Sequence, residues 1–442
     1  MAYIQGDGRN QGTLFPMVLD DLVTADNMCR VVDAFVEHLD MEKLGFERAE
    51  PASTGRPGYD PRDLLKLYLY GYLNQVRSSR RLETECRRNV ELMWLLGRLY
   101  PDHKSIAEFR RLHRDAIVAA GAELVRFARE CGLIRGEWIA IDGSKFRAVA
   151  SIDATRERVE LRRYLDKIEK ADEDQQAGID QSAVQTALEK LKQHPEPGAN
   201  FMLVRQMALP AYNVQTAVDA EHAIIVAHSV TLDASDNRCL KPMADAAKEA
   251  LGLSTLRVVA DAGYSNGEQI AQCEEAGITP FVPVMRTVNN QGDGKLFGRT
   301  DFKYDAETDS YTCPGKKKLL RKHTNLKDRY TMYKASSADC GACSLKPRCT
   351  LASRRGVARH LYEDALNRME ERVTPEAMRL RRQTVEHPFA TIKYPIFGHP
   401  RLLVRGLCGA KSEIAIATMA YNLKRITKVL GAGTLAAQLQ NC

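Results

Sequence analysis

The sequence predicts an α+β or α/β protein, in which a helical N-terminal domain precedes a mixed-sheet core that two insertions interrupt. In residues 1–132, apolar side chains recur at helical spacing between breaks that contain Gly and Pro. From residue 133 onward, short buried strands alternate with helices, which is typical of a mixed layer of strands and helices. Residues 153–198 and 290–355 break that alternation, the first with dense charge and the second with cysteines and lysines. We therefore expect a core made of residues 133–289 and 356–430, followed by a tail at 431–442.

The size and charge of the chain restrict what kind of protein it is. At 442 residues it is too long for one simple core, so two or three domains are expected. A composition that is 44% hydrophobic and 27% charged excludes wholesale disorder. The formal net charge of +7 permits a polyanionic partner but does not require one. We find no signal-peptide pattern and no apolar run of membrane-spanning length, so we expect a cytoplasmic protein whose 11 cysteines are thiols or metal ligands.

The N-terminal domain shows several helix starts. Asp60-Pro61 is a cap followed by proline at the first helical position, and Ser105 with Glu108 forms a capping-box pattern. The second pattern predicts one long helix that continues to about Cys131. Short helices in series, with Arg110 and Arg111 on the last one, fit a DNA reader of the helix-turn-helix type. A plain helical bundle with a solvated basic face fits equally well, so both interpretations stay open.

Two aspartates follow buried strands in the predicted core. Asp142 follows the apolar run that starts at Trp138, and Asp261 follows a short strand that starts at Leu256. Functional groups gather at strand ends in sheets of this kind. Asp142 with Gly143 is also a common hairpin-turn signal, which is the alternative. Between the two aspartates, the charged residues 153–198 predict an exposed helical hairpin inserted between strands.

A third carboxylate, Glu386, lies in a basic stretch near the C-terminus. Arg382 is one helical turn before it and Lys393 is two turns after it. On a helix all three would project from roughly the same side. An exposed helix face with an ordinary ion pair is the simpler explanation. If Glu386 joins the two aspartates, the three would form an oxygen-rich site suited to Mg²⁺, with Mn²⁺ as a substitute.

These three acids resemble the triad of bacterial insertion-sequence DDE transposases, whose catalytic core is RNase H-like. The matching contexts are Ile-Asp-Gly-Ser at Asp142, Ala-Asp-Ala-Gly-Tyr at Asp261 and Val-Glu-His-Pro-Phe-Ala-Thr-Ile-Lys at Glu386. Arg382, Glu386 and Lys393 match the Arg, Glu and Lys of the branch with a Tyr-Arg-Glu-Lys signature. Arg379 occupies the position of the signature tyrosine, which is a departure. The helices of residues 60–114 and the ending at 422–425 also resemble the group.

The resemblance implies a DNA transposase that cleaves the ends of an insertion element and joins them to target DNA by two-metal phosphoryl transfer. It implies that Asp142, Asp261 and Glu386 bind two Mg²⁺ ions, and that Arg382 and Lys393 contact DNA phosphates. Lys145 either touches DNA or is an ordinary surface lysine. The expected partner is double-stranded DNA, both terminal inverted repeats and target, bound by a homodimer associated with the nucleoid. The alternatives are a catalytically inactive DNA-binding or regulatory protein derived from a transposase, and a nuclease of the same fold that cuts without joining.

The insertion at residues 290–355 contains a compact group of cysteines. Cys340 and Cys343 have the two-residue spacing of a zinc half-site, and Cys313 and Cys349 could complete a Cys₄ shell. Reduced thiols that pack without metal are the alternative. The neighbouring basic tract, residues 316–322, suggests that the insertion clamps DNA.

Overall fold

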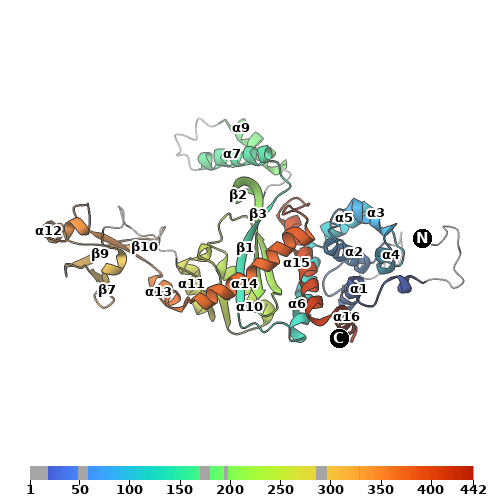
Figure 1. The fold of residues 1–442 in the computed structure, drawn as a ribbon. Helices are drawn as coiled ribbons and strands as arrows, with labels where there is room; N and C mark the ends of the chain where they lie inside the picture. The colour runs from blue at the N-terminus through green and yellow to red at the C-terminus, as the bar shows by residue number, and fades with distance from the viewer. Residues whose placement is uncertain are drawn as a thin grey trace, which may run out of the picture. The chain divides into compact units, whose positions relative to one another are not determined.

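The computed structural model describes residues 18–47, 58–169, 180–193, 198–284, 296–327 and 329–441. The fold belongs to the predicted α+β class and has a helical N-terminal region (Figure 1). The chain forms two compact units. The larger unit contains Met1–Asp236, Met243–Leu256 and Leu380–Cys442, and the smaller contains Asn237–Pro242 and Arg257–Arg379. Among the described residues, no helix is long and apolar enough to span a bilayer.

The larger unit begins with short helices that pack around one another. Asp60 caps α2 through a hydrogen bond of 2.8 Å from the Arg62 amide, with Pro61 at the first helical position, so this predicted helix start is confirmed. The elements are η1 (Leu19–Leu22), α1 (Met28–His38), α2 (Pro61–Leu73), α3 (Ser79–Cys86), α4 (Val90–Leu95), α5 (His103–Leu112) and α6 (Arg114–Glu130).

The single long helix predicted from Ser105 to Cys131 is wrong, because two helices occupy this stretch. Asp102, not Ser105, caps α5, since its carboxylate accepts the amides of Lys104 and Ser105 as well as the Ser105 hydroxyl. The chain leaves the helix at His113, where ψ is 36°. His113 closes the end of α5 with a ring contact of 2.9 Å to the Phe109 carbonyl.

An antiparallel sheet forms the centre of the larger unit. It contains β1 (Ile139–Arg147), β2 (Asn200–Val204), β3 (Met207–Asp219) and β4 (Ile225–Thr231), and β3 pairs with each of the others. Strand β1 continues well past Asp142, which pairs with Thr216, and Phe146 pairs with Tyr212. Asp142 therefore lies in the middle of a strand, and both the predicted strand end and the hairpin-turn alternative are wrong there.

Helices complete the larger unit. The charged residues after β1 form α7 (Ile152–Glu169) and α9 (Gln181–Gln193), which contact each other as the predicted hairpin (Figure 1). Helix α14 (Pro375–Thr391) enters this unit at Leu380 and continues as a π-helical turn, η5 (Ile392–Ile396). Pro395 lies inside that turn and has no N–H for a regular helical bond. Helix α15 (Leu407–Leu430) is largely buried against α2, α6 and β4, and α16 (Ala432–Asn441) follows it.

The smaller unit contains two short strands with flanking helices and a separate antiparallel sheet. The first part holds β5 (Leu256–Val259), η2 (Ala262–Tyr264), α11 (Gly267–Glu275), β6 (Ile278–Phe281) and α13 (Glu363–Arg372); α10 (Leu240–Leu251) precedes β5 and crosses the unit boundary. The sheet has the order β11-β10-β9-β8-β7 and is built on a core with Tyr311, Leu319 and Tyr333. Its strands and short helices are η3 (Arg299–Asp301), β7 (Lys303–Asp305), β8 (Ser310–Thr312), β9 (Lys318–Asn325), β10 (Tyr330–Lys334), α12 (Ser337–Gly341), η4 (Lys346–Arg348) and β11 (Gly356–His360).

Strand β11 is the edge strand of this sheet and directly precedes α13. Its residues pair with β10 from Gly356 opposite Lys334 to His360 opposite Tyr330.

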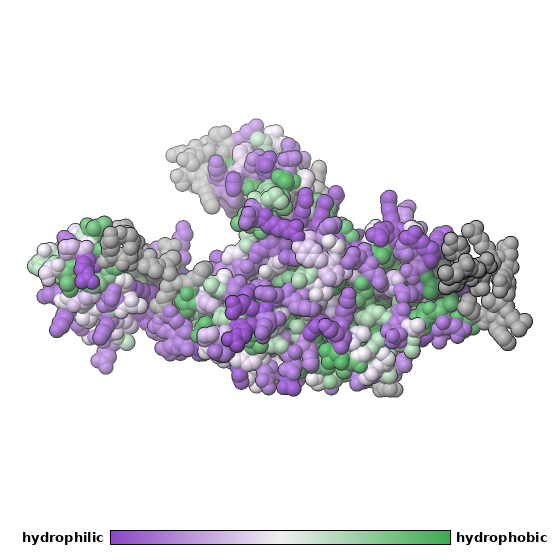
Figure 2. Space-filling model, in the orientation of Figure 1, coloured by the Kyte–Doolittle hydropathy of each residue, from purple (hydrophilic) through white to green (hydrophobic). Residues whose placement is uncertain are grey.

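Hydrophilic residues cover most of the visible molecular face (Figure 2).

Candidate functional site

Strand β1 is the platform of the candidate site. Because side chains alternate along a strand, Asp142, Ser144 and Phe146 share one face of it. The segment α14–η5 packs along that face at three points. The Arg381 guanidinium donates to Asp142 Oδ1 at 2.7 Å, the Lys393 ammonium donates to Ser144 Oγ, and the rings of Phe389 and Phe146 lie 6.3 Å apart.

Glu386 lies between these contact points on the same helix. It is solvent-exposed, as is Arg382. The helix predicted around Glu386 is confirmed from residue 375 to 391. With 3.6 residues per turn, Arg382, Glu386 and Lys393 project within an arc of about 40°. One exposed carboxylate therefore stands between two cations on a helix fixed to the strand of Asp142.

The surroundings of Asp142 are strongly cationic. Burial lowers the pKa of the Lys393 ammonium, the charges of Arg205 and Lys145 lower it further, and the Asp142 carboxylate opposes that change. The Arg381 and Asp142 side chains are only 16% and 20% exposed, so their ion pair is poorly screened by water. Such an arrangement holds an anion between two cationic side chains.

The opposite face of β1 carries a separate polar cluster. The Lys145 ammonium lies 3.0 Å from Asp236 Oδ1, and the amides of Asn213 and Gln215 each donate to the same oxygen at 2.7 Å. A Cβ on Gly143 would lie 2.2 Å from Gln215 Nε2, so a larger residue here would displace the Gln215 side chain from this cluster. Lys145 therefore has a structural ion-pair partner inside the larger unit.

Asp261 belongs to the smaller unit and follows β5, as the sequence predicted. Its side chain accepts the Gly263 amide at 2.8 Å and so caps η2. The residue is half-buried. The carboxylate is thus held by a local turn, in the way that helix starts commonly hold a side chain.

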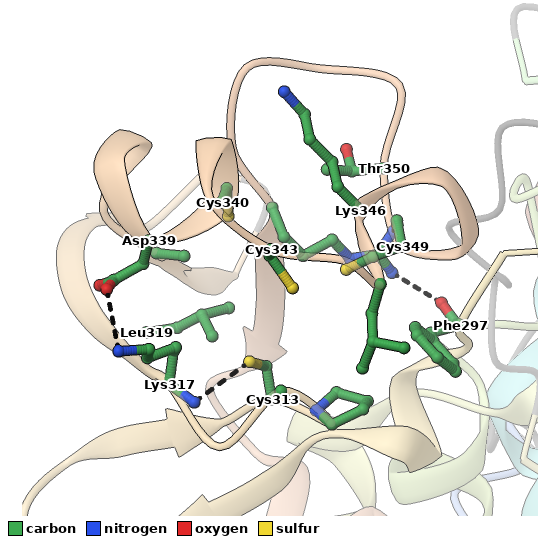
Figure 3. Close-up of a pocket in the computed structure, with 15 residues that line it drawn as sticks. Phe297, Cys313, Lys317, Leu319, Asp339, Cys340, Cys343, Lys346, Cys349 and Thr350 are labelled. Atoms are coloured by element: carbon green, nitrogen blue, oxygen red, sulfur yellow. Dashed lines mark hydrogen bonds and ion pairs between the residues drawn. The ribbon is translucent and has the colours of Figure 1, made fainter.

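The four cysteines singled out in the sequence line one small pocket of the smaller unit (Figure 3). The pocket has a volume of about 20 Å³, which accommodates a single water-sized sphere and no organic ligand. Burial raises the pKa of the Cys349 thiol; Arg355 opposes this, and Cys313, Cys340 and Cys343 reinforce it. Within the described part of the chain, no three His, Cys, Asp or Glu side chains form a ready-made metal shell.

Comparison with known proteins identifies the family. Residues 17–112 match the family described as "Transposase domain (DUF772)", and residues 205–423 match the "Transposase DDE domain". Together the two matches cover most of the chain. The chain belongs to the DDE transposases. Its family implies a DNA-binding enzyme that cleaves and transfers DNA strands and depends on divalent metal.

The other comparisons add little to this assignment. No curated protein matches the transposase. A solved structure titled as a cryo-EM piggyBac transposase synaptic complex with hairpin DNA aligns with 94% of this chain and 79% of that chain. The two are 8% identical and the TM-score is 0.36, so this likeness carries no functional weight.

The predicted DNA-contacting arginines of the transposase differ in their surroundings. Arg110 stacks over the Tyr68 ring at 5.2 Å and its guanidinium lies 3.4 Å from the Tyr72 hydroxyl. Arg111 is 60% exposed and pairs with Glu108 across one helical turn. Arg382, on α14, is also exposed. Arg111 and Arg382 are therefore open to a large ligand, whereas Arg110 is packed among aromatic rings.

Arg381 is the residue of the site that the sequence analysis missed. A signal for it exists, because Arg381, Val385 and Phe389 are spaced four residues apart and so lie on one helical stripe. Val385 and Phe389 are buried, at 1% and 6% exposure. A charged residue on such a stripe needs a partner of opposite charge. His387, by contrast, faces α15, where its ring lies 3.1 Å from the Tyr421 hydroxyl.

Proposed function

We propose that Asp142, Asp261 and Glu386 are the catalytic carboxylates of this transposase, and that they bind two Mg²⁺ ions, for which Mn²⁺ can substitute. The observation that carries the proposal is the seating of α14 on β1. Arg381 and Lys393 attach that helix beside Asp142, and Glu386 lies between them on the same segment. Asp261 joins the set by its motif and by its position after a strand.

The three side chains are of the chemical type that binds hard divalent cations. Carboxylate oxygens are the ligands that Mg²⁺ prefers, and Asp142 already attracts a cationic partner in Arg381. Bound metal would activate the attacking oxygen and stabilise the leaving oxygen of an in-line phosphoryl displacement. The protein's own part is to hold Asp142 on a paired strand and to present Glu386 on the helix fixed to that strand.

Arg382 and Lys393 are proposed to hold DNA phosphates next to the carboxylates. Guanidinium and ammonium groups are the usual phosphate partners in DNA complexes. Arg382 is exposed and can reach a phosphate directly, whereas Lys393 must exchange its bond to Ser144. Arg111 is a further candidate on the N-terminal helices. Arg110 and Lys145 would first have to leave their present partners, Tyr72 and Asp236.

In this proposal the enzyme cleaves insertion-element ends at terminal inverted repeats and joins them to target DNA. Joining two ends requires two DNA-binding sites, so we propose a homodimer in the assembly with DNA and an RNase H-like arrangement of the core. The protein would act at the nucleoid, where its target DNA is. Analytical ultracentrifugation with an end oligonucleotide tests the stoichiometry. A complex of the mass of one chain and one DNA end at saturation would contradict the dimer.

Conservative substitutions test the three acids. Asp142→Asn, Asp261→Asn and Glu386→Gln should each reduce Mg²⁺-dependent cleavage of an end oligonucleotide on the order of 10³-fold or more. DNA binding in a gel-shift assay should persist. Asp153→Asn is the matched control, because Asp153 is 91% exposed on α7 and should leave cleavage unchanged.

The outcomes separate this proposal from its rivals. Full cleavage by any one of the three variants would remove that acid from the site. Cleavage without joining by the wild type would indicate a nuclease. DNA binding without cleavage in either Mg²⁺ or Mn²⁺ would indicate a DNA-binding regulator that has lost its activity.

We also propose that Cys313, Cys340, Cys343 and Cys349 bind a structural Zn²⁺. Four thiolates are a standard zinc shell, and the pocket of about 20 Å³ is the size of an ion site. The cysteines come from segments on both sides of β9 and β10, so a bound metal would fix this part of the smaller unit.

Metal analysis of the purified full-length protein tests this second proposal. We expect about one zinc per chain, its loss in Cys340→Ser and Cys343→Ser, and its retention in Cys408→Ser, which alters an exposed cysteine. A wild-type protein without zinc, whose thiols react equally fast before and after chelation, would indicate reduced cysteines packed without metal.

A further inference from the structure

The pair formed by Arg381 and Asp142 has a consequence for metal binding. Arg381 Nη2 lies 2.7 Å from Asp142 Oδ1, on the strand face that also carries Ser144. The inference rests on the proposed function, in which Asp142 is a metal ligand. In that case the Asp142 carboxylate, which would bind the divalent metal ion, already neutralises the charge of Arg381.

The position of Arg381 makes this contact persistent. The arginine shares its helical stripe with Val385 and Phe389, which are buried. Its side chain is 16% exposed, so little water is available to replace the carboxylate. Desolvated guanidinium groups are costly without an anionic partner. The fold therefore holds Arg381 against Asp142 whenever no other cation competes for that oxygen.

A metal ion and the guanidinium are both cations that seek the same carboxylate. Like charges only a few ångströms apart repel strongly in a partly buried site. Lys393 adds a further positive charge close enough to Asp142 for the carboxylate to affect the pKa of its ammonium. Metal loading must therefore work against the field of Arg381, or move the guanidinium away from Oδ1.

We propose that Arg381 is a positioning residue that occupies the place of a metal's charge at Asp142, and that it competes with divalent cations for this carboxylate. In the metal-free protein, Arg381 keeps the strand and α14 together by cancelling the charge of Asp142. Binding of the divalent ion releases that contact. The arginine thus lowers the affinity for metal in exchange for an ordered site before metal and DNA arrive.

If Arg381 instead oriented Asp142 for metal binding, its removal would change the metal affinity in the opposite direction. A donor that orients a metal ligand and stays in contact with it strengthens metal binding, and its removal weakens that binding. The direction of the change in affinity on removing Arg381 therefore distinguishes competition from orientation. The measurement needs no catalysis, so it is independent of DNA cleavage.

The experiment titrates full-length protein without DNA with Mn²⁺ and follows free Mn²⁺ by electron paramagnetic resonance. We expect Arg381→Gln to bind the ion at least about threefold more tightly than the wild type. Arg381→Lys retains the charge, so its Mn²⁺ affinity should stay close to that of the wild type. This variant keeps the test informative if the glutamine variant does not fold. Arg379→Gln removes an exposed arginine of the same helix and should leave the affinity unchanged.

Melting temperatures provide a second readout. Without metal, Arg381→Gln should melt below the wild type, and saturating Mn²⁺ should reduce that difference. Equal or weaker Mn²⁺ binding by Arg381→Gln overturns the competition. Asp142→Asn separates this failure from failure of the proposed function, because Mn²⁺ binding that is unchanged in Asp142→Asn would show that Asp142 is not a metal ligand.

Discussion

Two arginines of the larger unit pair with a carboxylate at almost the same distance, yet the two regions differ in every other respect. Arg77 lies 2.8 Å from Glu413, and Arg381 lies 2.7 Å from Asp142. Glu413 is fully buried, and its second oxygen accepts the amides of Leu403 and Val404. Arg77 also donates to the carbonyls of Phe397 and Arg401. That pair is closed by backbone groups, which cannot leave.

The pair at Asp142 instead has a second side-chain cation, Lys393, close by. Arg381 lies on α14 and Lys393 lies on the π-helical turn that continues it. Both Arg381 and Asp142 retain some solvent exposure. The distance alone does not distinguish the two pairs. What distinguishes them is burial, because Glu413 is fully buried and bonded by backbone amides, whereas the Arg381 and Asp142 side chains are 16% and 20% exposed. The first kind of pair suits a structural strut between α15 and the segment after α2, and the second suits a binding site.

The largest effect is expected at the closed pair. Glu413→Gln leaves the Arg77 charge buried without an anion, which should cost about 3–5 kcal/mol of unfolding free energy. Arg381→Gln should cost less, about 1 kcal/mol, because glutamine can still donate a hydrogen bond to Asp142 and the Lys393 ammonium remains near that carboxylate. Urea unfolding followed by tryptophan fluorescence measures both, because the only two tryptophans, Trp94 and Trp138, lie in the larger unit.

A double substitution serves as the control for this first prediction. Arg77→Met with Glu413→Leu removes both charges and should recover part of the loss, although the Leu403 and Val404 amides remain unsatisfied. Similar costs for Glu413→Gln and Arg381→Gln would abolish the contrast between the two regions.

A smaller effect of opposite sign is expected at Lys393. Burial lowers the pKa of its ammonium, so the charged form is disfavoured in the folded state. The folded protein then gains stability as the pH rises from the lowered pKa toward the unfolded value of about 10.4. Lys393→Met should therefore stabilise the protein at pH 7 by about 0.5–1 kcal/mol, after allowance for partial exposure, and that gain should shrink above pH 9.

The same variant should weaken binding of DNA ends, which gel shifts at low salt would measure. A substitution that raises stability but weakens DNA binding is expected at a residue that serves ligand binding and not folding. If Lys393→Met destabilised the protein at pH 7, Lys393 would belong with the structural pair at Glu413.

The smallest effect is expected at Asp63, where burial changes the carboxyl pKa more than the nearby Lys66 does. Burial raises the pKa of Asp63 on α2 to about 6, although Lys66 opposes the shift. Because the folded pKa is raised, stability is lost as the pH rises from about 4 to about 6. Asp63→Asn should therefore stabilise the larger unit at pH 7.5 by roughly 0.5 kcal/mol, and by less at pH 5. An equal gain at both pH values would mean that Asp63 ionises normally.

Local patterns predicted the parts of the fold that depend on neighbours in the chain. The cap at Asp60, the helix around Glu386 and the position of Asp261 after a strand follow from contacts within a few residues. The pattern at Ser105 failed because Asp102, an equally good cap three residues earlier, starts the helix and accepts the Ser105 amide itself. Two competing local signals cannot be ranked from sequence spacing alone.

The sequence by itself determined the family and the helical spacing of Arg382, Glu386 and Lys393, and it nominated the three acids that we propose as catalytic. Only the tertiary structure decided that Asp142 lies inside a strand, because its neighbours pair with β3 some seventy residues later in the register that joins Asp142 to Thr216. It also decided the partner of Arg381, which is 239 residues away in the chain. A helical stripe shows that a buried arginine needs an anion, but only the packing of distant segments selects which carboxylate supplies it.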